Sequence, residues 1–300
     1  MNMKVDLCGV TLNNPVMTAS GTFGSGAEYA EFVDLNKLGA VVTKGVANVP
    51  WPGNPTPRVA EVYGGMLNAV GLQNPGIDLF VERDIPFLKQ FDTKIMVNVC
   101  GHSTEEYIEV VERLRDQPVD LLEINISCPN VKEGGIAFGQ DPKAVEAITK
   151  EMKKHAAQPV IMKLSPNVTD ITEMARAAEA GGADGLSLIN TITGMKIDIN
   201  KRTFALANKT GGMSGPAIKP VAVRMVYQVA NAVKIPVIGM GGIMTAEDAL
   251  EFILAGATAV SIGTANFINP DTTIQVIEGI EAYMKKYGVE DIHELIGAVH

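Results

Sequence analysis

The chain has 300 residues, of which 46% are hydrophobic and 20% charged, and its formal net charge is -9 at pH 7. This composition excludes a disordered chain and is sufficient for one large α/β domain or two smaller ones. Because Lys and Arg form no cluster in the sequence, we expect no nucleic-acid surface, and the expected partner is a small molecule or a protein.

The sequence also predicts where the protein resides. No apolar run approaches the ~18 residues of a membrane span, and the first residues contain no basic segment followed by an apolar one. The three cysteines, Cys8, Cys100 and Cys128, have neither CxxC nor CxxH spacing, so no disulfide framework and no cysteine-based metal site is predicted. We therefore expect a protein of the reduced cytoplasm, with no membrane association and no bound metal.

Taken in chain order, the sequence predicts a short hairpin at residues 5–12, followed by eight units of strand and helix. Apolar runs typical of buried strands lie at 16–19, 40–43, 95–98, 121–125, 160–163, 186–189, 237–240 and 259–262. Amphipathic segments with helical spacing lie at 104–115, 142–155, 169–180, 218–233 and 245–254. This alternation predicts an α/β fold, a single (β/α)8 TIM barrel that forms one domain of residues 1–300.

Two of the connections between a strand and the next helix are too long to be simple loops. They comprise residues 46–76 and 191–215. Ordered insertions of this length on the ligand-binding face of a barrel are usually functional. We therefore expect inserted hairpins over the C-terminal face of the barrel.

Glycine and lysine residues follow several of the predicted strands. The carboxyl ends of parallel strands meet at one edge, which is where such folds bind ligands. Glycine-rich turns at 239–242 and 263–264 follow the seventh and eighth strands, a usual phosphate position, although tight turns alone also need glycine. Lys44 and Lys163 end two apolar strands, and two ammonium groups at one edge indicate an anionic ligand, although either side chain alone could extend to solvent.

The loop after the fourth strand contains Cys128, the one evident acid/base group at this edge. Pro129 restricts the backbone of Cys128 to extended conformations. An ordinary small buried thiol is the alternative interpretation, but such a thiol does not require the neighbouring Asn125, Ser127 and Asn130. A free thiol has a pKa of about 8.5 and becomes a modest general base where adjacent donors help to form the thiolate.

A combination of five motifs points to a known family. They are Thr-Lys-Gly at 43–45, Asn-Ala-Val-Gly-Leu-Gln-Asn at 68–74, Asn-Ile-Ser-Cys-Pro-Asn-Val-Lys at 125–132, Lys-Leu-Ser-Pro-Asn at 163–167 and Gly-Met-Gly-Gly at 239–242. Together they resemble the class 1 dihydroorotate dehydrogenases. The continuation Lys-Glu-Gly-Gly-Ile-Ala-Phe-Gly at 132–139 resembles the NAD-linked class 1B catalytic subunit more than the fumarate-using class 1A enzymes.

The resemblance implies one FMN per chain, bound across the mouth of the barrel. Its phosphate would contact Gly241, Gly242, Gly263 and Thr264, and its ring and ribityl chain would contact Ser20, Lys44, Gly45, Asn98, Asn125, Lys163, Ile189 and Gly215. Dihydroorotate would contact Lys44, Asn68, Ala69, Val70, Gly71, Leu72, Asn125, Asn190 and Thr191, with Asn130 as a further candidate. Cys128 would remove the proton from C5 of dihydroorotate while a hydride passes from C6 to N5 of FMN, which yields orotate for de novo pyrimidine synthesis.

The resemblance also implies a second polypeptide. Class 1B enzymes pass electrons from FMN to NAD through a subunit that carries FAD and a 2Fe-2S cluster, in a heterotetramer of two catalytic and two electron-transfer subunits. This sequence has neither a four-cysteine cluster pattern nor a GxGxxG motif after a strand. Two alternatives stay open, namely a fumarate-dependent class 1A enzyme and a non-redox phosphate-binding barrel, which leaves Cys128, Asn68 and Lys163 without a role.

Overall fold

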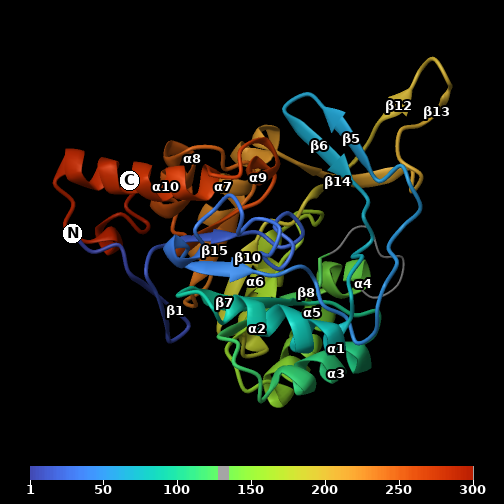
Figure 1. Cartoon of the computed structure of the whole chain (residues 1–300), viewed down its shortest axis with the longest axis horizontal. Coiled ribbons are helices and arrows are strands. Elements are labelled where there is room, and N and C mark those ends of the chain that lie inside the picture. Colours follow the sequence, from blue (N-terminus) through green and yellow to red (C-terminus); the bar gives the residue numbers. More distant parts are fainter. Residues whose placement is uncertain (128–134, 300) are drawn as a thin grey trace.

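A computed structural model of the chain describes residues 1–127 and 135–299. In these residues eight parallel strands close into a barrel, which confirms the predicted fold class (Figure 1). In order around the barrel the strands are β3 (Val16–Thr18), β4 (Ala40–Val42), β7 (Lys94–Val99), β8 (Leu121–Asn125), β9 (Val160–Lys163), β10 (Gly185–Leu188), β15 (Val237–Met240) and β16 (Ala259–Ile262). Most of their residues are apolar and buried, because side chains fill the barrel inside and helices cover it outside.

The predicted strand bounds agree with the structure to within two residues. Four of the eight strands, β8, β9, β15 and β16, have the bounds that the apolar runs indicate. The strand predicted at 186–189 begins and ends one residue earlier, because Gly185 pairs with Ile161 of β9. Strand β10 ends at Leu188, so Ile189 belongs to the loop that lines the barrel mouth.

Amphipathic helices form the outer layer, and side chains cap the start of several of them. Ser103 accepts a hydrogen bond from Glu106 N, Asp141 accepts one from Lys143 N, and Thr245 and Asp248 cap each other reciprocally, so these three predicted helix starts are confirmed. The main helices are α3 (Thr104–Leu114), α5 (Pro142–His155), α6 (Ile171–Ala180), α7 (Lys219–Ala230), α8 (Ala246–Leu254) and α10 (Thr272–Tyr287). Shorter helical segments are η1 (Leu35–Lys37), α1 (Ile77–Leu79), η2 (Phe80–Asp84), α2 (Ile85–Leu88), α4 (Gly135–Gln140), η3 (Pro216–Ile218), α9 (Ala265–Ile268) and η4 (Ile292–Glu294).

The predicted N-terminal hairpin is present as the antiparallel pair β1 (Val5–Leu7) and β2 (Val10–Leu12). In its turn the thiol of Cys8 donates a hydrogen bond to the carbonyl oxygen of Asp184 at 3.2 Å, directly before β10, so the hairpin lies at the N-terminal end of the barrel. Burial, followed by the negative charges of Asp184 and Asp6, raises the pKa of Cys8 to about 12. Cys8 is therefore a protonated thiol with a structural contact at neutral pH.

The two long insertions form one sheet over the other end of the barrel. The first insertion contributes β5 (Val59–Val62) and β6 (Gly65–Asn68), and the second contributes β11 (Ile192–Met195) and β14 (Thr210–Ser214). These strands pair antiparallel in the order β11-β14-β6-β5, and a small hairpin of β12 (Ile197–Asp198) and β13 (Thr203–Phe204) extends further outward (Figure 1). The expected inserted hairpins thus share a sheet through β14 and β6. Within the described ranges, no helix has the length and apolar character needed to cross a membrane.

Candidate active site

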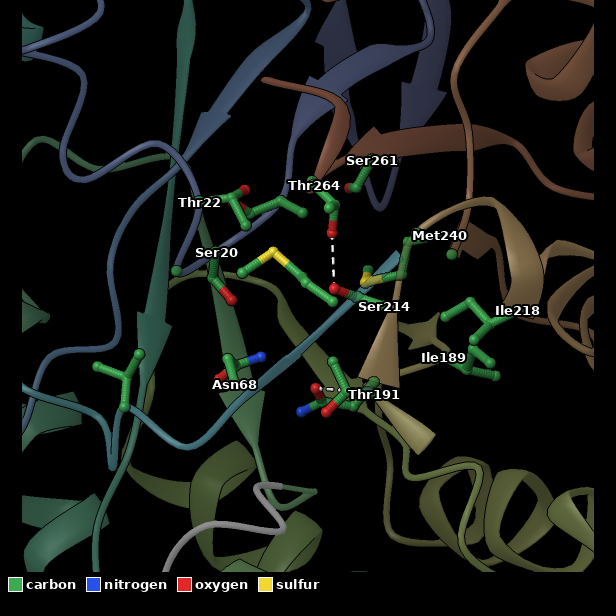
Figure 2. A pocket seen from close by; sticks show the side chains of 18 of the residues that line it. Ser20, Thr22, Asn68, Ile189, Thr191, Ser214, Ile218, Met240, Ser261 and Thr264 are labelled. Carbon is green, nitrogen blue, oxygen red and sulfur yellow. Dashed lines mark hydrogen bonds between the residues drawn. The ribbon is translucent and has the colours of Figure 1, made fainter. Parts of the chain in front are cut away.

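A pocket lies at the carboxyl ends of the barrel strands and is closed on another side by residues of β6 and β14 (Figure 2). The structure brings every residue predicted to contact FMN to the wall of this pocket, namely Ser20, Lys44, Gly45, Asn98, Asn125, Lys163, Ile189, Gly215, Gly241, Gly242, Gly263 and Thr264. Of the residues predicted to contact only the substrate, Asn68, Val70, Gly71, Leu72, Asn190 and Thr191 also line it. One cavity therefore collects residues from nearly the whole length of the chain.

Among the described residues named from the sequence, Ala69 is not one of those that line the pocket. Ala69 packs with Leu67 and Leu206 in a small separate apolar cluster, and its N–H donates to the carbonyl oxygen of Arg58 at 2.7 Å. Successive residues of an extended segment point to opposite sides, so Ala69 faces away from the pocket that Asn68 lines. Cys128 and Asn130 lie outside the described residues.

At one end of the pocket, glycine residues adopt backbone conformations that other residues rarely take. Gly215, Gly241 and Gly242 have φ angles of 107°, 126° and 78°. A Cβ atom on Gly242 would lie 2.8 Å from the carbonyl oxygen of Gly215, so the turn admits only glycine there. Turns of this kind leave backbone N–H groups accessible to a phosphate, and the turn at Gly241 and Gly242 follows β15, the seventh barrel strand, where such barrels usually bind phosphate.

Two serines at this end were not assigned as site residues from the sequence. Thr264 Oγ1 donates a hydrogen bond to Ser214 Oγ at 2.7 Å, which joins the end of β14 to the loop after β16 (Figure 2). The hydroxyl of Ser261 lines the pocket, is buried and has no hydrogen-bond partner among the residues that the structure describes. Buried hydroxyl groups are nearly always hydrogen-bonded, so the hydroxyl of Ser261 suits a polar ligand at this end.

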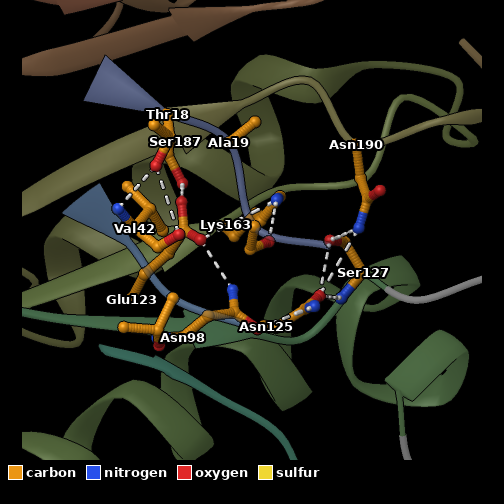
Figure 3. A network of polar contacts seen from close by, with 12 residues as sticks. Thr18, Ala19, Val42, Asn98, Glu123, Asn125, Ser127, Lys163, Ser187 and Asn190 are labelled. Carbon is orange, nitrogen blue, oxygen red and sulfur yellow. Dashed lines mark hydrogen bonds and ion pairs between the residues drawn. The ribbon is translucent and has the colours of Figure 1, made fainter. Parts of the chain in front are cut away.

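Along the floor of the pocket, amide and hydroxyl side chains hold one another in place (Figure 3). Asn125 Nδ2 donates to Asn98 Oδ1 at 3.3 Å, Ser127 Oγ donates to Asn125 Oδ1 at 3.1 Å, and Asn190 Nδ2 donates to Ser127 Oγ at 2.8 Å. Asn98 and Asn125 come from neighbouring strands, β7 and β8. These amides are therefore oriented before a ligand binds, as recognition of a polar heterocycle requires.

Both predicted lysines reach the same pocket. Lys163 is 4% exposed, and its Nζ donates to Ser20 Oγ at 3.0 Å and lies 3.7 Å from Glu123 Oε2. Lys44 lines the pocket as well, and within the described chain no Asp or Glu does so. The lining therefore carries positive charge, which suits an anionic ligand. Glu123, which is buried behind Lys163, was not predicted as a site residue from the sequence.

Asp248 on α8 holds the turn that leads from the glycine pair into the helix. Its Oδ2 accepts hydrogen bonds from the N–H groups of Met244 and Thr245 at 2.9 and 3.0 Å, and its Oδ1 accepts one from Lys219 Nζ at 2.6 Å. Burial by itself would raise the pKa of Asp248, but the hydrogen bonds from Lys219 and from the two backbone N–H groups outweigh it, so that the pKa is lowered. Asp248 therefore favours its charged form while it shapes the turn.

Replacing Asp248 with Asn should destabilise the protein at neutral pH, and this loss should shrink as the pH falls below 3.8 and through the folded-state pKa. The folded-state pKa lies below the ordinary value of 3.8, so the carboxylate stabilises the fold above that pH, and this contribution is lost as the pH falls through the folded-state pKa. Urea unfolding of the two proteins at several pH values measures the difference. Glu251→Gln, which removes only the other contact of Lys219, is the matched control with a smaller expected loss. If the difference in unfolding free energy between wild type and D248N did not become smaller in acid, this role of Asp248 would be contradicted.

Comparison with known proteins agrees with this geometry. The chain matches the family model described as Dihydroorotate dehydrogenase over residues 2–284. It is 75% identical over 299 residues to the catalytic subunit of dihydroorotate dehydrogenase B (NAD(+)) from Lachnoclostridium phytofermentans, with 100% of both chains covered. It is 68% identical to the protein of the same description from Alkaliphilus metalliredigens, over 100% of this chain and 99% of that relative. The crystal structure of DHODH in complex with ferulenol from Eimeria tenella has the same fold, with a TM-score of 0.83 at 23% identity over 99% of this chain and 88% of that one.

Proposed function

Because this chain belongs to the dihydroorotate dehydrogenase family, we propose that it is the catalytic subunit of an NAD-linked dihydroorotate dehydrogenase. The reaction is the oxidation of (S)-dihydroorotate to orotate in pyrimidine biosynthesis. The observation that carries the proposal is the pocket itself, which joins a glycine-rich end, a floor of fixed amides and two lysines at the carboxyl ends of the barrel strands. We further propose that residues 1–300 act as one domain and that the protein is cytoplasmic.

FMN fits this pocket on three observations. The glycine turns after β15 and β16 suit its phosphate, the unpartnered hydroxyl of Ser261 lies at the same end, and the buried ammonium of Lys163 lies at the floor. Gly241, Gly242, Gly263 and Thr264 would hold the phosphate, while Ser20, Lys44, Gly45, Asn98, Asn125, Lys163, Ile189 and Gly215 would hold the ribityl chain and the ring. Bound FMN supplies a two-electron hydride acceptor.

The residues of this chain have separate tasks toward the substrate. Lys44, in the loop after β4, neutralises the carboxylate of dihydroorotate. The amides of Asn68, Asn125 and Asn190 hydrogen-bond the ring, and Val70, Gly71, Leu72 and Thr191 complete the wall. Cys128 takes the proton from C5 as general base. Ala69 acts indirectly, because its side chain packs with Leu67 and Leu206 while its neighbours Asn68 and Val70 line the pocket.

The proposal includes a partner protein. The relatives are described as catalytic subunits of NAD(+) enzymes, which supports a second subunit. We propose that this subunit carries FAD and a 2Fe-2S cluster and passes the electrons to NAD. We propose a heterotetramer of two catalytic and two electron-transfer subunits. The order of electron flow is then dihydroorotate, FMN, partner and NAD.

The test is purification of the chain alone and together with the electron-transfer subunit. We expect the chain alone to carry FMN, with its yellow absorption spectrum, and dihydroorotate to bleach that spectrum without oxygen. We expect NAD reduction only when the partner is present. Failure to retain FMN after reconstitution would overturn the proposal. Rapid fumarate reduction by the chain alone would replace the NAD-linked assignment with the fumarate-dependent one.

A further inference from the structure

A buried carboxylate lies directly behind the floor of the pocket. Glu123 is 1% exposed and sits on β8 two residues before Asn125, so the two side chains point to the same side of the strand, into the barrel. Asn125 lines the pocket, and Glu123 lies one layer deeper. A buried charge is costly unless other groups compensate for it, so the contacts of Glu123 require an explanation.

Both carboxylate oxygens of Glu123 have partners (Figure 3). Oε2 accepts a hydrogen bond from Asn98 Nδ2 at 2.6 Å and lies 3.7 Å from Lys163 Nζ. Oε1 accepts a hydrogen bond from Ser187 Oγ at 2.7 Å. The three partners come from β7, β9 and β10, and Asn98 lies directly opposite Glu123 in the register of β7 and β8. One side chain thus fixes two residues of the pocket, Asn98 and Lys163, from behind.

The arrangement also determines the charge that a ligand meets. The ammonium of Lys163 lies at the pocket wall, with the carboxylate of Glu123 on its far side. Charges interact strongly in a buried site because little water screens them. A negative charge that develops on a bound ligand is stabilised by Lys163 and destabilised, to a smaller extent because of the greater distance, by Glu123.

We propose that Glu123 is a positioning residue that orients Asn98 and Lys163 and sets the reduction potential of the flavin. The inference rests on the proposed binding of FMN. Reduction adds electrons to the flavin ring, and the positive charge of Lys163 favours the reduced form. The negative charge of Glu123 offsets part of this effect and lowers the potential, which favours transfer of the electrons onward to the next acceptor.

Two substitutions separate the effect of the charge of Glu123 from the effect of its side-chain length. Glu123→Gln keeps the length and can still accept from Asn98, but it removes the charge. We expect E123Q to bind FMN. The ratio of its affinity for reduced FMN to its affinity for oxidised FMN should be at least about tenfold higher than in wild type, which for a two-electron couple is a positive shift of about 30 mV in the reduction potential. Glu123→Asp keeps the charge, but its side chain is too short to contact the same partners. We therefore expect weaker FMN binding with a reduction potential close to that of wild type.

The measurements are the FMN dissociation constant by fluorescence and the two-electron potential by spectroelectrochemical titration. Glu123→Leu is a second uncharged variant in case E123Q does not fold, and Ser187→Ala is the control that removes a hydrogen bond while both charges stay. An unchanged or more negative potential in the uncharged variants would overturn the electrostatic role, and unaltered FMN affinity in E123D would overturn the positioning role. Loss of FMN from wild type itself would instead overturn the proposed function.

Discussion

Replacing Cys128 with Ser is expected to slow the reduction of bound flavin by dihydroorotate at least about 100-fold near neutral pH. The reason is that a serine hydroxyl is a much weaker base than a thiol, so the proton at C5 is no longer removed efficiently. The two side chains are similar in size, and binding of FMN and orotate should therefore be retained. Stopped-flow absorbance of the flavin under anaerobic conditions measures this single step without the partner subunit.

The matched control for this variant is Cys8→Ser. Cys8 lies in the N-terminal hairpin, its thiol contacts Asp184, and its raised pKa keeps it protonated, so its loss should leave the rate of flavin reduction unchanged. A thiol reagent that inactivates wild type and C8S equally but not C128S would give independent support. Near-native flavin reduction by C128S would show that another group is the base.

Replacing Lys163 with Met should cause a large loss of stability. The substitution leaves the carboxylate of Glu123 buried without the ammonium that lies 3.7 Å away. Removal of one member of a buried ion pair costs about 3–5 kcal/mol, because the remaining charge is uncompensated. Urea unfolding of the FMN-free protein should show a loss of this order, and the variant should also bind FMN weakly.

The double variant Lys163→Met, Glu123→Gln tests the cause of that loss. It should recover the greater part of the unfolding free energy, because no buried charge remains, while FMN affinity stays low. Lys153→Met is the matched control, because Lys153 pairs with Asp184 where both side chains are 32% exposed, and the expected loss there is below about 1 kcal/mol. If the double variant were as unstable as K163M, the lost stability would come from packing and not from charge.

The barrel and much of the site could be predicted because both depend on local sequence patterns. Each buried strand is a short apolar run, and the residue that ends a parallel strand must lie at the same edge as the ends of the others. This geometry is why the sequence alone could place Lys44, Asn98 and Lys163 around one pocket. The family resemblance added the residues of the insertions, which strand ends alone do not indicate.

The residues that were missed depend on contacts between distant segments. Alternation along β8 places Glu123 on the same side as Asn125, but it does not indicate that Asn98, Lys163 and Ser187 converge on the carboxylate. Ser214 lies on β14, which pairs with β6 of the other insertion, and it meets Thr264 of the loop after β16. Ala69 belongs to a motif whose neighbours line the pocket, but its side chain packs on the opposite side.

The sheet shared by the two insertions holds pocket residues of both. In its central pair, Asn68 lies opposite Gly212 and Met66 lies opposite Ser214, so one backbone ladder joins these parts of the pocket wall. A shift of one residue in either strand would turn every side chain of that strand to the other face of the sheet. A change of register in one insertion would therefore displace pocket residues that the other insertion holds in place.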